Sequence, residues 1–202
     1  KSKKILLTVS NGVLSNNSIE FSPKLPSSKV QAISNLPMGT LNKAGILFKK
    51  GTFQEKNEGW YVACNGETES KISSVMSFEI RTRPENHMII FFGGKEGKEL
   101  ENFPERTFAR IKLVVSQTFG HDLLNGITNF VSSSWGSDVY SVGSYSYALP
   151  GKSKEREQLR KPLENKLFFA GEATNKDHYG TCHGAYMSGI QAAKEIIKKL
   201  NF

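Results

Sequence analysis

The end of the chain constrains the fold more than any other segment. A hydrophobic run, LFFA at residues 167–170, ends in Gly171 and Glu172, and after a polar loop a helix is expected over residues 182–200. A short apolar run bounded by glycine is typical of a buried strand. A closing unit of strand, loop and helix resembles the carboxyl edge of an open α/β sheet, where ligands usually bind.

The residues around this loop suit a binding site. The first N–H groups of the predicted helix, near Thr181, have no intrahelical acceptors and can face an anionic or electron-rich ligand. Glu172 can accept hydrogen bonds from ribose-like or ribityl hydroxyls. Small residues allow close approach along one helix face: Gly184, Ala185, Ser188, Gly189 and Ala192. The alternative is tight helix–sheet packing with Glu172 as an exposed cap.

The preceding chain predicts a β-meander with helices, so that the fold class is α/β with a mixed, helix-flanked sheet. Turn residues delimit the elements, including an Asn65-Gly66 turn. The predicted strands are 4–9, 40–51, 59–66, two strands joined by the turn RPEN (83–86), 127–132 and 167–172. A short helix buries Val30, Ile33 and Leu36, and a helix over 102–120 buries Phe108, Ile111, Leu113 and Val115. Phe168, Phe169 and Tyr147 are predicted core residues.

Composition excludes several function classes. The net charge of +8 comes mostly from lysines spread along the 202 residues, without an arginine cluster, so neither nucleic acid nor a membrane is an expected partner. No apolar run approaches the ~20 residues that cross a bilayer, and a cytoplasmic location is expected. The two cysteines, Cys64 and Cys182, and the four histidines show no metal-ligand spacing, so no metal is expected.

Four motifs resemble those of flavin-containing amine oxidases, the family of polyamine oxidases, monoamine oxidases and lysine-specific histone demethylases. LFFAGEAT with YGTCHGAYMSGIQAA resembles the C-terminal signature of that family. ILLTVSNGVL, LPMGTLNKAGILF and WGSDVYSVGSYSYALPG resemble earlier family landmarks in the same order. The resemblance covers essentially the whole chain, as the C-terminal half of such an enzyme with a Rossmann-like FAD domain.

The resemblance implies specific flavin contacts. Glu172, beside Gly171, matches the glutamate that contacts the ribityl–pyrophosphate arm of FAD, and Thr181 and Cys182 match the pair at the pyrimidine edge of the flavin ring. Lys43 matches the catalytic lysine that contacts flavin N5 through a water. If Lys43 were buried, its charged form would be costly and a partly neutral amine would result. The alternative for Lys43 is an edge-strand lysine that reaches solvent.

Aromatic residues complete the implied site. Trp135 and Tyr140 match positions near the flavin ring, Tyr145 matches one wall of the substrate cage, and Thr181 stands where monoamine oxidases place the second cage tyrosine. Ser144 occupies the position of the flavin-bonded cysteine of monoamine oxidases, so the FAD is expected to be noncovalent. Core packing is the alternative for these aromatic residues.

The phosphate-binding fingerprint GxGxxG is missing. The most similar segment is FFGGKEG (91–97), but its glycines do not have the GxGxxG spacing and no helix is expected after it. We therefore predict weak or absent FAD binding by this chain alone, unless a separate chain supplies the missing half. The expected domains are a strand of the FAD domain (1–14), a substrate-binding domain (15–150) and the C-terminal part of the FAD-binding domain (151–202).

The implied reaction is oxidation of an amine C–N bond. Hydride transfer to FAD N5 would give an imine and then an aldehyde with ammonia or an amine, while dioxygen is reduced to hydrogen peroxide. One alternative is a non-catalytic fragment or binding module. Another is an L-amino-acid oxidase, which needs an arginine for the substrate carboxylate; Arg81 and Arg83 are candidates but are predicted to face solvent.

Overall fold

The structure is a computed structural model that describes residues 2–63 and 76–200. The chain divides into two units: unit 1 is Lys1–Gly39 with Asp138–Phe202, and unit 2 is Thr40–Ser137. Cys64 and the predicted turn at Asn65-Gly66 lie outside the described residues.

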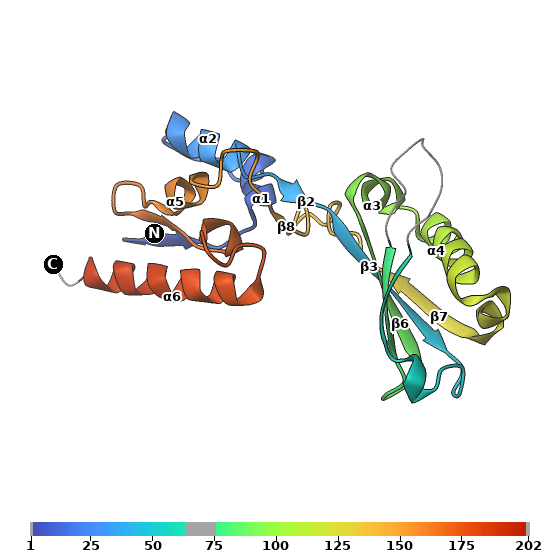
Figure 1. Cartoon of the computed structure of the whole chain (residues 1–202). Coiled ribbons are helices and arrows are strands. Elements are labelled where there is room, and N and C mark those ends of the chain that lie inside the picture. The colour runs from blue at the N-terminus through green and yellow to red at the C-terminus, as the bar shows by residue number, and fades with distance from the viewer. Residues whose placement is uncertain (1, 64–75, 201–202) are drawn as a thin grey trace. The chain divides into compact units, whose positions relative to one another are not determined.

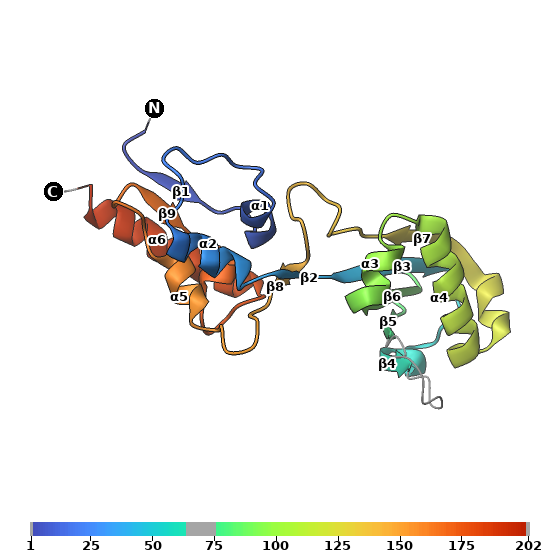
Figure 2. The ribbon, with the colours of Figure 1, turned by 90° about the horizontal axis from the view of Figure 1, so that it is seen from above.

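Unit 1 is built around two parallel strands. Strand β1 (Ile5–Leu7) pairs with β9 (Leu167–Phe169) in parallel. Helix α6 (Cys182–Lys198) lies on one side of the pair, and α2 (Ser27–Ser34) and α5 (Glu155–Arg160) lie on the other (Figures 1 and 2). Phe168 and Phe169 are almost fully buried between these layers, which confirms the predicted buried strand.

The boundaries of unit 1 differ from the expected domains. Helix α2 packs on α5 through a second apolar cluster: Ala32, Ile33, Leu36, Leu159 and Ala173. Strand β2 (Met38–Gly39) pairs antiparallel with β8 (Tyr145–Ser146). Residues 15–39 and 138–150 therefore lie with the two ends of the chain rather than with the central meander.

Unit 2 is a five-stranded sheet in the order β4-β5-β6-β3-β7, whose neighbouring strands are all antiparallel. The strands are β3 (Leu41–Phe48), β4 (Gly59–Ala63), β5 (Met76–Arg81), β6 (His87–Gly93) and β7 (Ile127–Ser132). The RPEN turn joins β5 and β6 as predicted. The chain as a whole is thus a mixed α/β structure.

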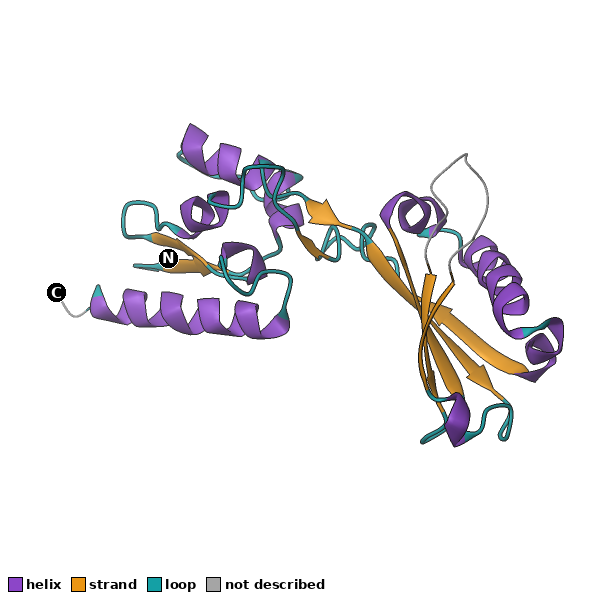
Figure 3. Ribbon diagram, viewed as in Figure 1, coloured by secondary structure: helices purple, strands orange, loops and turns teal. Residues whose placement is uncertain are grey.

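One face of this sheet carries the core of unit 2. Helices α3 (Gly94–Leu100) and α4 (Pro104–Phe119) lie on that side (Figure 3). Ile111, Val114 and Val115 of α4 pack against the inward residues of the strands. Among the described residues of unit 2, no α-helix covers the opposite face, called the open face below (Figure 3), and period-2 alternation places Lys43 there.

Three side chains predicted to be buried are exposed instead. Leu113 is 49% exposed because Val114, its neighbour in α4, occupies the stripe that faces the sheet. Val30 is 49% exposed and Tyr147 is 46% exposed, and neither belongs to the apolar cluster of unit 1.

The segment FFGGKEG also differs from expectation, because helix α3 begins at Gly94 directly after β6. A strand–glycine–helix sequence is therefore present. It does not form a phosphate-binding βαβ unit, since β6 pairs only with antiparallel neighbours.

Two absences apply to residues 2–63 and 76–200. No helix in this part of the chain is both long and apolar enough to cross a bilayer. The same residues contain no group of three or more histidine, cysteine, aspartate or glutamate side chains placed to hold a metal ion.

Candidate functional site

The carboxylate of Glu172 is the centre of the candidate site in unit 1. Glu172 begins the short 3-10 helix η3 (Glu172–Thr174), directly after β9. Its Oε1 accepts a hydrogen bond from the Ser146 backbone N–H (2.8 Å). Its Oε2 accepts from Ser146 Oγ (2.9 Å) and from the Gly180 N–H (2.7 Å). A carboxylate has about four acceptor sites, so three protein donors leave about one for a ligand.

Helix α6 begins beside this carboxylate, as predicted. Thr181 is the N-cap; its hydroxyl accepts from the Gly184 N–H (3.0 Å) and donates to the His178 carbonyl (2.7 Å). This hydroxyl is therefore engaged in capping, and the remaining donors are backbone groups. Among the described residues, the N–H groups of Cys182 and His183 meet no acceptor. These N–H groups, with the dipole of a 17-residue helix behind them, can face an electron-rich ligand edge.

The small residues of α6 bring the helix against the end of β9. Ser188 accepts from the Gly171 N–H (2.9 Å) and donates to the Gly171 carbonyl (3.1 Å). Gly184 lies so close to the preceding loop that an added Cβ would stand 1.8 Å from the His178 carbonyl oxygen. Gly171 has φ of +136°, and an added Cβ there would meet nothing within 4 Å. The predicted close approach of helix and strand end is present in the structure.

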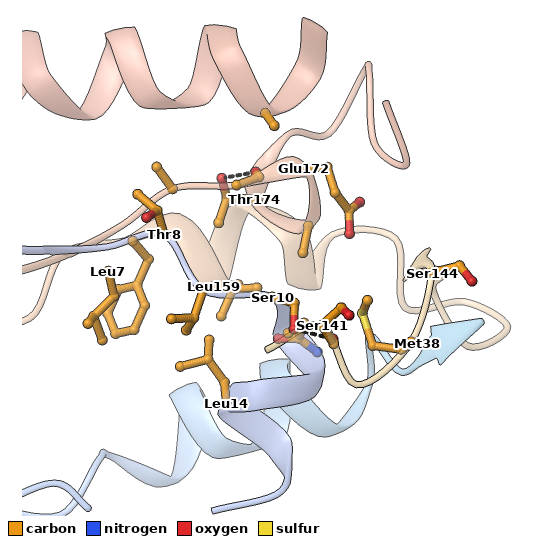
Figure 4. Close-up of a pocket in the computed structure, with 18 residues that line it drawn as sticks. Leu7, Thr8, Ser10, Leu14, Met38, Ser141, Ser144, Leu159, Glu172 and Thr174 are labelled. Carbon is orange, nitrogen blue, oxygen red and sulfur yellow. Dashed lines mark hydrogen bonds between the residues drawn. The ribbon is translucent and has the colours of Figure 1, made fainter. Parts of the chain in front are cut away.

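A cavity of about 230 Å³ opens next to Glu172 (Figure 4). Glu172 extends from η3 on the side of the loop that carries Ser141 and Ser144. The other walls come from the end of β1 and the start of α1 (Asn11–Ser15). They include polar residues that sequence reasoning missed: Thr8, Ser10 and Asn11. The motif ILLTVSNGVL contained the signal, because polar residues directly after a parallel strand lie at its carboxyl end.

Two of the predicted aromatic residues lie in unit 1, but only one contacts the Glu172 corner. The ring of Tyr145 packs on Gly180, whose added Cβ would lie 3.5 Å from Tyr145 Cδ2. Tyr145 is 40% exposed and is therefore not a core residue. Tyr140 is 86% exposed on the preceding loop, where its N–H donates to Asp138 Oδ1 (2.7 Å). Hydrogen bonds from Tyr140 and Ser141 lower the pKa of Asp138 below its ordinary value.

Lys43 and Trp135 lie in unit 2, and one hydrogen-bond network holds both. The Lys43 N–H donates to Ser133 Oγ (2.9 Å), and its carbonyl accepts from the Ser133 N–H (2.8 Å). Asn42 Oδ1 accepts from Ser133 Oγ (3.1 Å) and from the Trp135 N–H (3.0 Å). The structure thus places the predicted catalytic lysine and a predicted flavin contact on adjoining segments.

A buried carboxylate anchors this network. Glu101 is 7% exposed, and its Oε1 accepts from Asn42 Nδ2 (3.0 Å) and the Gly136 N–H (2.6 Å). An added Cβ on Gly136 would lie 2.4 Å from Glu101 Oε2, so any larger residue would displace this carboxylate from its hydrogen bonds. Neither Asn42 nor Glu101 was predicted as a site residue.

The burial assumed for Lys43 is not present in unit 2. Lys43 is exposed, with Nζ 5.2 Å from the centroid of the Phe91 ring. Of the alternative, the exposure to solvent is confirmed but the edge-strand position is wrong, because β3 lies between β6 and β7. Trp60 and Phe91, 5.0 Å apart between ring centroids, share the open face with Lys43. Strand alternation was the signal that could have identified these two aromatic residues.

Comparisons with known proteins identify the family of this chain. The sequence profile described as "Flavin containing amine oxidoreductase" matches residues 1–197. Polyamine oxidase 2 of Arabidopsis thaliana is 36% identical over 193 residues, which cover 94% of this chain and 38% of that protein. Lysine-specific histone demethylase 1 homolog 3 of the same plant is 35% identical over 196 residues, 96% of this chain and 12% of the relative.

A solved structure shares the fold. Cyclohexylamine Oxidase from Brevibacterium oxydans IH-35A superposes with a TM-score of 0.76 at 21% identity, covering 98% of this chain and 43% of the other. The chain therefore spans less than half the length of these similar proteins. The profile match over nearly all residues shows that the chain belongs to the family of flavin-containing amine oxidoreductases.

Proposed function

We propose that the protein is a flavin-dependent amine oxidase in which unit 1 contributes part of the FAD site and unit 2 contributes a substrate-facing surface. Bound FAD would supply the acceptor for a hydride from the carbon next to the amine nitrogen, and dioxygen would take up the two electrons. The resulting imine hydrolyses to an aldehyde and ammonia or an amine, and hydrogen peroxide is the second product.

The observation that supports this proposal is the corner formed by Glu172 and the start of α6. It offers about one free carboxylate acceptor position and two backbone donors without acceptors among the described residues. The adjacent cavity of about 230 Å³ is smaller than the ~300–1,000 Å³ typical of pockets for whole ligands. The residues present thus fit part of an FAD molecule.

The FAD is expected to be attached noncovalently because of Ser144, which lines the cavity. The resemblance implies that monoamine oxidases carry the flavin-bonded cysteine at this position. A serine cannot form the thioether bond that a cysteine forms with a flavin. Glu172 would hold the ribityl–pyrophosphate arm, and the N–H groups of Cys182 and His183 would face the ring.

An amine fits the exposed aromatic residues better than an amino acid does. Trp60 and Phe91, whose ring centroids lie 5.0 Å apart, can orient an amine through their ring faces. An amino-acid substrate needs an available arginine, but Arg81 donates to Glu79 Oε1 (2.5 Å) and Arg83 pairs with Glu55. No residue described here is placed as a general base, so the amine would bind in its neutral form.

Lys43 provides the sharpest test. We assign Lys43 to holding a water at the reactive edge of the flavin, the role that the resemblance implies. In the full-length protein, Lys43→Met is expected to lower amine-dependent peroxide release about 100-fold, because an ordered proton donor is lost. Flavin content should stay unchanged. Lys49→Met, an exposed lysine just after β3, is the matched control.

Peroxide release would be measured with three kinds of amine substrate: a diamine, a polyamine and an aromatic monoamine. If the Lys43→Met variant released peroxide at the wild-type rate, the role assigned to Lys43 would be contradicted, but the proposed function would not. A flavin-loaded protein that oxidises none of these amines would contradict the proposed function.

A non-catalytic binding module is the second candidate. It is favoured by the absence of GxGxxG from the sequence and by the parallel sheet of only two strands in the described part of unit 1. Failure of the full-length protein to retain any flavin would support it.

A further inference from the structure

Arg156 is buried without a direct acidic partner. It lies in α5 and is 1% exposed, although arginine is rarely buried unless it is paired. Its guanidinium lies 4.2 Å from the centroid of the Tyr179 ring. Its Nη1 donates to the Ala173 carbonyl (3.1 Å), and its Nη2 donates to the Ser146 carbonyl (3.3 Å). Its buried Nε meets no acceptor among the described residues.

A single hydroxyl connects Arg156 to Glu172. Nη1 of Arg156 donates to Ser146 Oγ (2.7 Å), and Ser146 Oγ donates to Glu172 Oε2 (2.9 Å). Burial lowers the pKa of Arg156, while the negative charge of Glu172 opposes that shift. The guanidinium keeps its charge in any case, because arginine is not deprotonated in proteins.

This spacing has two physical consequences. The cation lies close enough to offset the charge of Glu172 in a partly buried site, where charges interact more strongly than in water. Because Ser146 stands between them, the guanidinium does not occupy both carboxylate oxygens, as a bidentate pair would. Glu172 thus keeps about one acceptor position.

We infer that Arg156 is a positioning residue that, through Ser146, orients Glu172 and compensates its charge so that the carboxylate can lie beside the diphosphate of FAD. The inference rests on the proposed function. Without Arg156, an uncompensated carboxylate would repel the diphosphate. The loss should therefore be larger for FAD, which carries phosphates, than for riboflavin, which carries none.

The test compares dissociation constants for FAD and riboflavin in the full-length protein by quenching of flavin fluorescence. Arg156→Met is expected to weaken FAD binding about 10- to 100-fold, the usual range for a lost charged hydrogen bond. Riboflavin binding should change by less than about threefold. Arg156→Lys should restore most of the FAD affinity, since it restores the charge. Arg160→Met is the matched control, because Arg160 is exposed in the same helix.

Three outcomes separate the alternatives. Equal losses for FAD and riboflavin, or no rescue by lysine, would show a structural role and overturn the inference. Unchanged FAD binding in Arg156→Met would overturn it as well. A wild-type protein that binds neither flavin would contradict the proposed function itself. If Arg156→Met does not fold, Ser146→Ala removes the connecting hydroxyl and should give the same selective loss of FAD affinity.

Discussion

At the scale of single residues, the candidate site depends on two glycines that other parts of the chain approach too closely for a Cβ atom to fit without a shift. Gly184 allows the loop before α6 to close onto the helix, and Gly136 allows the turn after Trp135 to approach Glu101. These glycines fix the backbone that presents N–H groups to the site. The sequence identified Gly184 as one of a row of small residues, but only the structure shows what approaches it.

Gly184→Ala tests the closure of that loop. The new Cβ would lie 1.8 Å from the His178 carbonyl oxygen, so the loop must move and the Thr181 cap should weaken. We expect the free energy of unfolding to fall by about 1–3 kcal/mol, measured by urea denaturation. Gly189→Ala in the same helix is the control, because its Cβ would meet nothing within 4 Å. It should be neutral or stabilising by up to about 1 kcal/mol. Equal stability of the two variants would contradict the argument.

At the scale of elements, α2 and α5 are joined by a buried lysine. Lys29 Nζ donates to the carbonyls of Gln158 (2.9 Å), Leu159 (2.8 Å) and Lys161 (2.6 Å), and it lies 4.3 Å from the Phe169 ring centroid. The last carbonyls of a helix lack intrahelical donors, so Lys29 caps the C-terminus of α5. This contact holds the helix that carries Arg156.

Lys29 should make stability depend on pH. Burial, and secondarily the charge of Lys161, lowers its pKa from 10.5 to about 8. Between these values the unfolded chain binds more protons than the folded chain, so the free energy of unfolding should rise with pH. Between about pH 8 and 10.5, Lys29 should raise the free energy of unfolding by about 3 kcal/mol. Below about pH 8 it should cause no rise. The rise is measured as the difference between wild type and Lys29→Met in urea titrations from pH 7 to about pH 10.5.

Lys24→Met, an exposed lysine just before α2, is the control for the loss of a positive charge. A difference between wild type and Lys29→Met that stays constant with pH would contradict the assignment.

At the scale of the whole molecule, the residues predicted for the flavin site are divided between the two units. Unit 1 holds Glu172, Cys182 and Tyr145, and unit 2 holds Lys43 and Trp135. Neither unit contains a glycine-rich turn that leads from a strand into a parallel crossover among its described residues.

Residues 1–202 alone should therefore bind FAD weakly or not at all. Each missing diphosphate hydrogen bond forfeits ~1 kcal/mol or more. We expect desalting after incubation with FAD to remove the flavin absorbance from this chain, whereas the same step should leave a flavin amine oxidase that carries the GxGxxG segment yellow. Retention of stoichiometric flavin by residues 1–202 would contradict the prediction.

The sequence by itself determined the closing strand–loop–helix, helix α4 and the hairpin of β5 and β6, together with the position of Glu172 between the last strand and the start of α6. Local periodicity and turn residues encode these features, because each depends on residues near in sequence. Tertiary structure alone decided that Arg156 and Lys29 are buried, that Asn42 and Glu101 support Trp135, and that Lys43 is exposed. Lys29 and Leu159 are 130 residues apart, and no local pattern distinguishes a lysine that caps a distant helix from one that faces solvent.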